Sequence, residues 1–347
     1  MRQLLGQNDI AGMRTQGVDL GFRWKEILGE IEKETGFQPD WTVVSRGSWW
    51  KTGKVGAVNV LGQMEVNHKK ERVVLKIQGT KPATSEIEMI KAFEGQNKSR
   101  LIRPPKIYDF MPWDEERQFE AFFMEYIEGK PVINHYPALE LELTNFFDLL
   151  LEYRKHCINK PWIKKPETWD YSSSYHSWTS AVKRWLKKDK FTEKEDYDLV
   201  EKGVQILERE LGVEQLEFVH GHFQPGDLLL DGQGKYVLFS NLFWSYRIPL
   251  YDLVFSYHWR MLEMEHADDL TREKLEGERG RWLDRLFQLE IVKARKNGER
   301  FLKLALFERA IPCLMVDRLM MDSAKPSYKI ITEGARDQLK KLISELA

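Results

Sequence analysis

Residues 218–252 read FVHGHFQPGDLLLDGQGKYVLFSNLFWSYRIPLYD and carry the most informative pattern in the chain. Two apolar runs, Leu228–Leu230 and Val237–Phe239, flank the glycine-containing segment Asp231–Gly234. Apolar runs on both sides of such a turn predict a β-hairpin. Polar residues stand before and after this hairpin, in the HGH and PLYD sequences. The segment therefore combines a structural hairpin with candidate site residues at both of its ends.

Upstream of this segment the hydrophobic pattern changes near Pro131. Before it, the periodicities predict strands over 41–46, 57–66, 72–78, 106–110 and 119–127, and helices over 22–35 and 84–93. After it, they predict helices over 139–158, 174–188 and 192–211, and again from residue 250 onward. This order predicts an α+β fold of two lobes, in which a small β-rich lobe precedes a larger, mainly helical lobe that contains the inserted hairpin.

We expect three parts along the chain. Residues 1–40 form an N-terminal extension with a helix, residues 41–128 form the small lobe, and residues 129–347 form the helical lobe that contains segment 218–252.

Segment 218–252 resembles the catalytic segment of the aminoglycoside phosphotransferase and choline kinase superfamily, the small-molecule relatives of protein kinases. That family shows H-G-D-x-x-P-x-N and an apolar run, then a turn, two apolar residues with an aspartate, and P-x-Y-D. The matching residues here are His220, Gly221, Pro225, Leu228–Leu230, Val237–Phe239, Pro249, Tyr251 and Asp252. The resemblance implies a kinase-like fold over about residues 40–260, with ATP and Mg²⁺ as cofactors and a small molecule as ligand.

The resemblance also assigns residues of the small lobe. Lys76 matches the strand lysine that binds the nucleotide phosphates, and Glu86, or Glu88 as an alternative, matches its ion-pair partner. Met124 and Glu125 match the strand beside which adenine lies. These residues, together with Ser240, are the predicted nucleotide contacts.

Three polar positions depart from the family pattern. His222 replaces the aspartate that accepts the proton of the acceptor hydroxyl or orients that hydroxyl. Asp227 replaces an asparagine metal ligand, and Ser240, followed by Asn241, replaces the aspartate that bridges Mg²⁺ and the phosphates. Mg²⁺ prefers carboxylate oxygens, so one carboxylate, an imidazole and a hydroxyl are a poor match for it. We predict His222 and Asp227 as the catalytic positions, and Asp227 with Asn241 as the remaining metal ligands.

For other residues the sequence indicates a structural role or leaves the role open. The resemblance gives His220 and Asp252 the role of bracing the loop. The segment 45–56 holds three glycines outside the GxGxxG spacing, with Trp49 and Trp50 in a loop that would have to approach phosphates. An acidic cluster of Glu263, Glu265, Asp268 and Asp269 reads as a solvated helix end, or as a site for a cationic substrate.

Three functions fit these residues. The first is a degenerate member of the superfamily, a pseudokinase that binds a ligand or regulates another process. The second is an atypical ATP-dependent phosphotransferase, in which Asp227 binds Mg²⁺ and His222 assists a hydroxyl of a small molecule. The third is a metal-dependent hydrolase that uses His220, His222 and Asp227, since imidazole is a good zinc ligand.

Composition narrows the setting of the protein. The 347 residues carry 53 Lys and Arg against 54 Asp and Glu, so the net charge of −1 argues against a nucleic-acid partner. The two cysteines, Cys157 and Cys313, predict neither a disulfide framework nor a zinc site. No apolar run is long enough for a membrane span, and the polar N-terminal residues do not resemble a secretory signal. We expect a cytoplasmic protein that binds a small molecule, with a protein partner as a further option.

Overall fold

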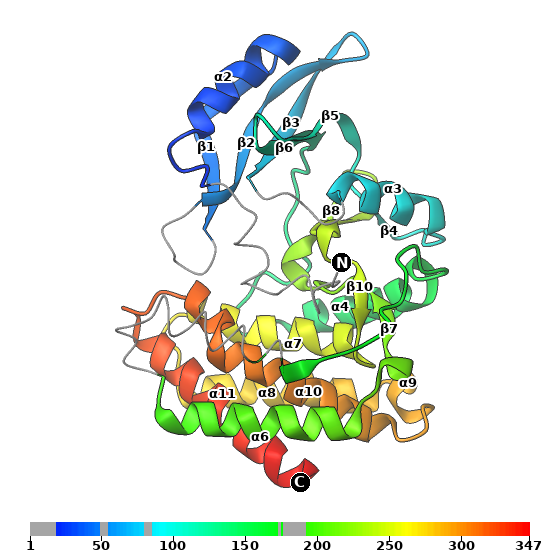
Figure 1. Cartoon of the computed structure of the whole chain (residues 1–347), viewed down its shortest axis with the longest axis vertical. Helices are drawn as coiled ribbons and strands as arrows, with labels where there is room; N and C mark the ends of the chain where they lie inside the picture. The colour runs from blue at the N-terminus through cyan, green and yellow to red at the C-terminus, as the bar shows by residue number, and fades with distance from the viewer. Residues whose placement is uncertain (1–18, 49–54, 80–84, 173–174, 176–191) are drawn as a thin grey trace.

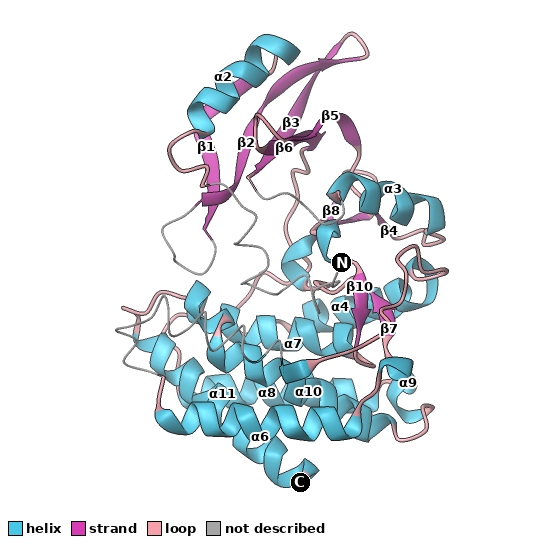
Figure 2. Cartoon of the chain, in the orientation of Figure 1, coloured by secondary structure: helices cyan, strands magenta, loops and turns pink. Residues whose placement is uncertain are grey.

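An antiparallel five-stranded sheet lies above a helical body (Figure 1). The computed structural model describes residues 19–48, 55–79, 85–172, 175 and 192–347. Helices and strands segregate between the two halves, apart from short strands inserted near their junction (Figure 2). The predicted α+β fold with two lobes is confirmed.

The sheet of the small lobe has the order β1-β2-β3-β6-β5, so β3 is its middle strand. The strands are β1 (Gln38–Ser48), β2 (Val55–Val66), β3 (Lys69–Gln78), β5 (Ile107–Asp114) and β6 (Phe119–Glu125). Asn67 and His68 both have positive φ, 50° and 64°, as a tight two-residue hairpin requires. The turn therefore consists of these two residues alone, and β3 begins at Lys69, three residues before the strand predicted over 72–78.

Helix α2 (Trp24–Thr35) covers one face of this sheet (Figure 1). Its buried residues Ile27, Leu28 and Ile31 join a core with the sheet. The helix ends at Gly36, whose φ of 70° is a conformation that glycine adopts without a steric penalty. The predicted helix began two residues earlier, at Phe22, which is 94% exposed.

Helix α3 (Glu86–Gln96) joins the two lobes. It begins after Ser85, whose side chain accepts a hydrogen bond from the Ile87 N–H group. Its Met89 and Phe93 are buried in the core of the helical lobe, whereas the core under α2 contains no α3 residue. The helix therefore packs its apolar side against the lower lobe.

Short strands surround the predicted hairpin. β8 (Leu228–Leu230) and β9 (Tyr236–Leu238) pair antiparallel as predicted, and β4 (Ile102–Arg103) joins β9 in parallel. The sequence pattern did not predict β4. A second pair, β7 (Glu217–Val219) and β10 (Ser245–Arg247), encloses the hairpin in the chain.

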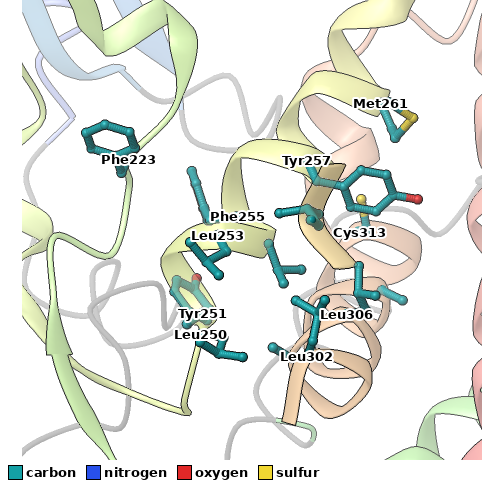
Figure 3. Packing of buried hydrophobic residues seen from close by; sticks show 14 of the residues in the cluster. Phe223, Leu250, Tyr251, Leu253, Phe255, Tyr257, Met261, Leu302, Leu306 and Cys313 are labelled. Carbon is teal, nitrogen blue, oxygen red and sulfur yellow. The ribbon is translucent and has the colours of Figure 1, made fainter. Parts of the chain in front are cut away.

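Most of the remaining described chain is helical. The α-helices are α4 (Glu140–Glu152), α6 (Lys194–Glu210), α7 (Tyr251–Glu263), α8 (Arg272–Gln288), α9 (Glu290–Lys293), α10 (Gly298–Met315) and α11 (Pro326–Leu346). Single turns are formed by Val213–Gln215, Pro225–Asp227, Asn241–Phe243, Met264–His266 and Asp317–Met320. Figure 3 shows side chains of α7 and α10 meeting in the core, among them Tyr257, Leu306 and Cys313.

Two helix predictions change in detail. The predicted helix over 139–158 stops being α-helical at Glu152 and continues as a π-helical turn over Tyr153–Cys157. The helix predicted over 192–211 begins at Lys194 as α6, and the Asp196 carboxylate accepts a hydrogen bond from Glu193 N–H at 2.9 Å at its start. The predicted helix over 174–188 lies outside the described residues except for Tyr175. No helix in the described part of the chain is long and apolar enough to cross a membrane.

Candidate functional site

A cavity of about 240 Å³ lies between the sheet and the β8–β9 hairpin. Four of the five predicted nucleotide contacts line it: Lys76, Glu86, Met124 and Ser240. The other lining residues are Asn59, Val74, Pro105, Phe239 and Asn241. Residues that are up to 182 positions apart in the sequence, Asn59 and Asn241, thus meet in one hollow. Of the loop predicted over 45–56, residues 45–48 and 55–56 belong to β1 and β2, and residues 49–54 lie outside the described residues.

Lys76 and Glu86, which both line the cavity, form an ion pair. Lys76 Nζ donates to Glu86 Oε2 at 2.6 Å, and Gln78 Nε2 donates to the same oxygen at 2.9 Å. Glu86 is 4% exposed, whereas the alternative partner Glu88 is exposed. The first of the two predicted partners therefore makes the contact.

A second buried carboxyl, Glu120 on β6, was not predicted. It is 2% exposed, and its Oε1 has no hydrogen-bond partner among the described residues. Burial raises the pKa of Glu120 to about 7, and the negative charge of Glu86 adds to this effect. The only sequence signal was a charged residue in a strand that otherwise reads as apolar.

Met124 and Glu125 at the end of β6 have different surroundings. Met124 lines the cavity, but the Glu125 carboxylate turns to Arg103 and accepts a hydrogen bond from Lys106 N–H at 2.7 Å. Arg103 also binds Asp231 at 2.8 Å, in the turn of the β8–β9 hairpin. The predicted ligand contact Glu125 thus belongs, by its side chain, to a bridge between the lobes.

The three positions that depart from the family pattern are bonded to one another. Nδ1 of His222 lies 2.6 Å from Oδ2 of Asp227, and the Ser240 hydroxyl donates to Oδ1 of Asp227 at 2.9 Å. Asp227 is 8% exposed. Both of its carboxylate oxygens are therefore occupied by side chains of the protein itself.

Aromatic rings fix the imidazole of His222. It stacks on Phe243 with ring centroids 4.5 Å apart, and it contacts Phe255 at 4.6 Å and Trp259 at 5.6 Å. Gly221, directly before it, has a φ of 75°, and a Cβ there would lie 2.3 Å from the Phe243 carbonyl oxygen. Only glycine lets the chain pass Phe243 so closely.

Asn241 is held by the scaffold. Its Nδ2 donates to the Leu238 carbonyl at 2.8 Å, and its Oδ1 accepts from Trp244 Nε1 at 3.0 Å. The amide oxygen that would ligate a metal is engaged in this contact.

His220 and Asp252 are buried supports. The His220 N–H donates to the Tyr153 hydroxyl at 2.7 Å, and burial lowers the pKa of its ring to about 3. Asp252 binds Arg154, which also binds Glu217 at 3.1 Å. The three proposed ligands of a hydrolase metal do not converge, since no group of three His, Cys, Asp or Glu in the described chain could hold a metal.

Glu263, at the end of α7, faces His222 and Asp227. Burial raises its pKa to about 7, although the nearby Arg260 opposes this shift, and Asp227 contributes to it. Of the acidic cluster predicted as a solvated helix end, Asp268 and Asp269 are exposed, whereas Glu263 is half-buried near Asp227 and His222. The pattern could not reveal this, because it depends on how α7 packs.

Neither a protein-family model nor a curated protein matches the sequence. Solved structures do match. A thermostable mutant of the aminoglycoside phosphotransferase APH(4)-Ia in apo form is 13% identical, with a TM-score of 0.53 over 91% of this chain and 97% of that chain. The choline kinase LicA from Streptococcus pneumoniae is 14% identical, with a TM-score of 0.52 over 92% and 99%.

The fold is that of the aminoglycoside phosphotransferases and choline kinases. At these low identities the likeness establishes the fold, and the roles of individual residues have to come from the site itself. Another mutant of APH(4)-Ia, 11% identical with a TM-score of 0.54, was solved as a ternary complex with AMP-PNP and hygromycin B. It covers 92% of this chain and 98% of its own.

Proposed function

We propose that this protein binds a nucleotide in the cavity under Lys76 and acts as a ligand-binding or regulatory protein, without the usual metal-assisted phosphoryl transfer. The cavity unites the Lys76–Glu86 pair with Met124 and Ser240. A lysine fixed by a carboxylate suits the phosphates of a nucleotide. The nucleotide complex of the similarly folded APH(4)-Ia mutant supports this choice of ligand.

The proposal rests on the hydrogen-bond partners of Asp227. Its two oxygens accept from Ser240 and contact His222, and the Asn241 amide is engaged with Trp244. Mg²⁺ takes one or two carboxylates in addition to phosphate oxygens. The donor set present does not fit Mg²⁺, because binding it would first break these hydrogen bonds.

Calorimetric titration of ATP with and without Mg²⁺ tests the proposal. We expect similar binding in both conditions, and loss of affinity in Lys76→Ala. Glu86→Gln should also weaken binding, whereas Glu88→Gln on the exposed side of α3 is the matched control. Binding that strictly requires Mg²⁺ would contradict the metal-independent site, and unchanged affinity in Lys76→Ala would contradict the placement of the nucleotide.

A second candidate is an atypical phosphotransferase that acts on a hydroxyl of a small molecule. The short contact between His222 Nδ1 and Asp227 favours it, because a carboxylate on Nδ1 orients an imidazole as a general base. The test is release of ADP from ATP across a panel of hydroxyl-bearing small molecules. Release that requires both an acceptor and His222 would support this candidate, and none above the rate of the heat-treated protein would oppose it.

A cytoplasmic location is part of the proposal. Both cysteines are free and buried, as suits a reducing compartment.

A further inference from the structure

The three replaced positions of the site act as one unit centred on Asp227. This unit begins at the cavity, where Ser240 is a lining residue, and continues through Asp227 to His222. His222 therefore lies two hydrogen bonds away from the proposed nucleotide site. The inference that follows rests on the proposed nucleotide binding, and it differs from the second candidate function in its acceptor, which is a residue of the protein itself.

The contact with Asp227 determines which ring nitrogen of His222 carries the proton. Asp227 accepts a hydrogen bond from Ser240 at Oδ1, and its Oδ2 lies 2.6 Å from His222 Nδ1. An Nδ1–H group that donates to Oδ2 completes this arrangement and leaves the lone pair of the ring on Nε2. No described residue hydrogen-bonds Nε2, and 17% of the side chain is exposed.

Packing fixes the plane of the imidazole ring. The ring is stacked on Phe243 at an interplanar angle of 20° and is flanked by Phe255. Asp227 anchors the opposite nitrogen. A nitrogen nucleophile fixed by a partner on its other ring atom is the arrangement that nucleophilic catalysis uses.

The chemistry of the replacement explains all three changes together. A hydroxyl acceptor needs a base to take its proton, whereas the Nε2 lone pair of a neutral imidazole attacks without one. With His222 as the acceptor, the family's catalytic aspartate is no longer needed. Asp227 becomes a positioning residue, and Ser240 satisfies its second oxygen. Fewer carboxylates also leave less negative charge beside the phosphates.

We propose that His222 is itself the phosphoryl acceptor and that the protein phosphorylates this histidine from a nucleoside triphosphate. The Nε2 lone pair forms a bond to the γ-phosphorus. The bond between that phosphorus and the β,γ-bridging oxygen breaks, and its electron pair leaves with the nucleoside diphosphate. The ring keeps its Nδ1 proton and gains a positive charge, which faces the Asp227 carboxylate.

The experiment incubates the full-length protein with γ-³²P-labelled ATP, with Mg²⁺ in one arm and EDTA in the other. We expect a protein label that is acid-labile and alkali-stable, as a phosphoramidate is, and mass spectrometry of the wild-type protein should map it to His222. His222→Gln should lose the label, and Asp227→Ala should slow labelling on the order of tenfold or more. His68→Gln, in the exposed β2–β3 turn, is the matched control and should label normally.

Calorimetry of ATP on the same preparation separates the outcomes. Binding without any label overturns the phosphohistidine and leaves the proposed nucleotide site standing. Absence of binding overturns both. A label that maps to another residue also overturns the inference, and this mapping uses wild-type protein, so it does not depend on whether a variant folds.

Discussion

The hydroxyl of Ser240 donates to Oδ1 of Asp227 at 2.9 Å, from a backbone whose φ of 60° lies in the left-handed region. Aspartate tolerates that conformation better than most residues. Ser240→Asp should therefore keep the backbone and place a second carboxylate against Asp227. Without metal, the repulsion should lower stability by about 2 kcal/mol.

Added Mg²⁺ should restore that stability in Ser240→Asp, since two adjacent carboxylates make a cation site. The measurement is the melting temperature with and without MgCl₂. Ser240→Ala is the control, which should lose about 1 kcal/mol for one hydrogen bond and show no response to Mg²⁺. A Ser240→Asp protein that melts at the same temperature in both conditions would contradict this view of Asp227.

Glu120 predicts a pH effect on stability. Its pKa is about 7 in the folded protein against an ordinary value of 4.5, so the folded state binds more protons between these values. Stability from this group is therefore present below pH 4.5 and is lost as the pH rises through 7. Glu120→Gln should remove that loss and gain up to about 3 kcal/mol at pH 8 relative to the wild type.

Urea denaturation of wild type and Glu120→Gln at several pH values measures this difference. Glu116→Gln, at an exposed position in the β5–β6 turn, is the control. A constant difference between wild type and Glu120→Gln across the pH range would show that Glu120 keeps its ordinary pKa.

Substitution of Arg103 measures how much the bridge between the lobes contributes to the free energy of unfolding. It is 19% exposed and binds Glu125 and Asp231, whose side chains are 9% and 5% exposed. Arg103→Ala leaves two buried carboxylates without their partner and should cost about 3 kcal/mol by chemical denaturation. Arg117→Ala breaks a pair with Glu34 in which both side chains are 44% exposed. That control should cost less than about 1 kcal/mol, and equal costs would contradict the bridge.

The position of the His222 ring should be sensitive to substitution of Gly221. Gly221→Ala adds a Cβ that meets the Phe243 carbonyl and forces an alanine into a φ of 75°. The strain should cost about 2 kcal/mol and displace Phe243 from its stack on His222. NMR of the His222 ring protons should show a changed ring-current shift, whereas Gly232→Ala, in open space in the hairpin turn, should leave it unchanged.

Much of the fold was predictable because local patterns decide it. The β8–β9 hairpin follows from two apolar runs and a turn, and α2 follows from its apolar stripe and Gly36. The parallel strand β4 was not predictable, because its two residues pair with a strand more than 130 positions later. The π-helical turn at Tyr153 was also missed, since the same periodicity continues through it.

For the candidate site, the family resemblance named four residues that line the cavity, but it could not reveal side-chain direction. Glu125 turns away to Arg103, and the Asn241 amide binds Trp244. Glu120 and Glu263 come near the site only through the packing of β6 and α7. The mutual hydrogen bonds of the three substituted positions likewise depend on tertiary structure that no spacing rule contains.

The attachment of α3 has a mechanical consequence. Met89 and Phe93 pack α3 against the core of the helical lobe. Glu86 is therefore anchored to the helical lobe, whereas Lys76, its partner, lies on the sheet. A movement of one lobe relative to the other would therefore change the 2.6 Å distance between Lys76 Nζ and Glu86 Oε2. The distance between Lys76 and Glu86 therefore reports how closed the two lobes are. A pair of spectroscopic labels, one on the sheet and one on α3, would measure changes in this distance.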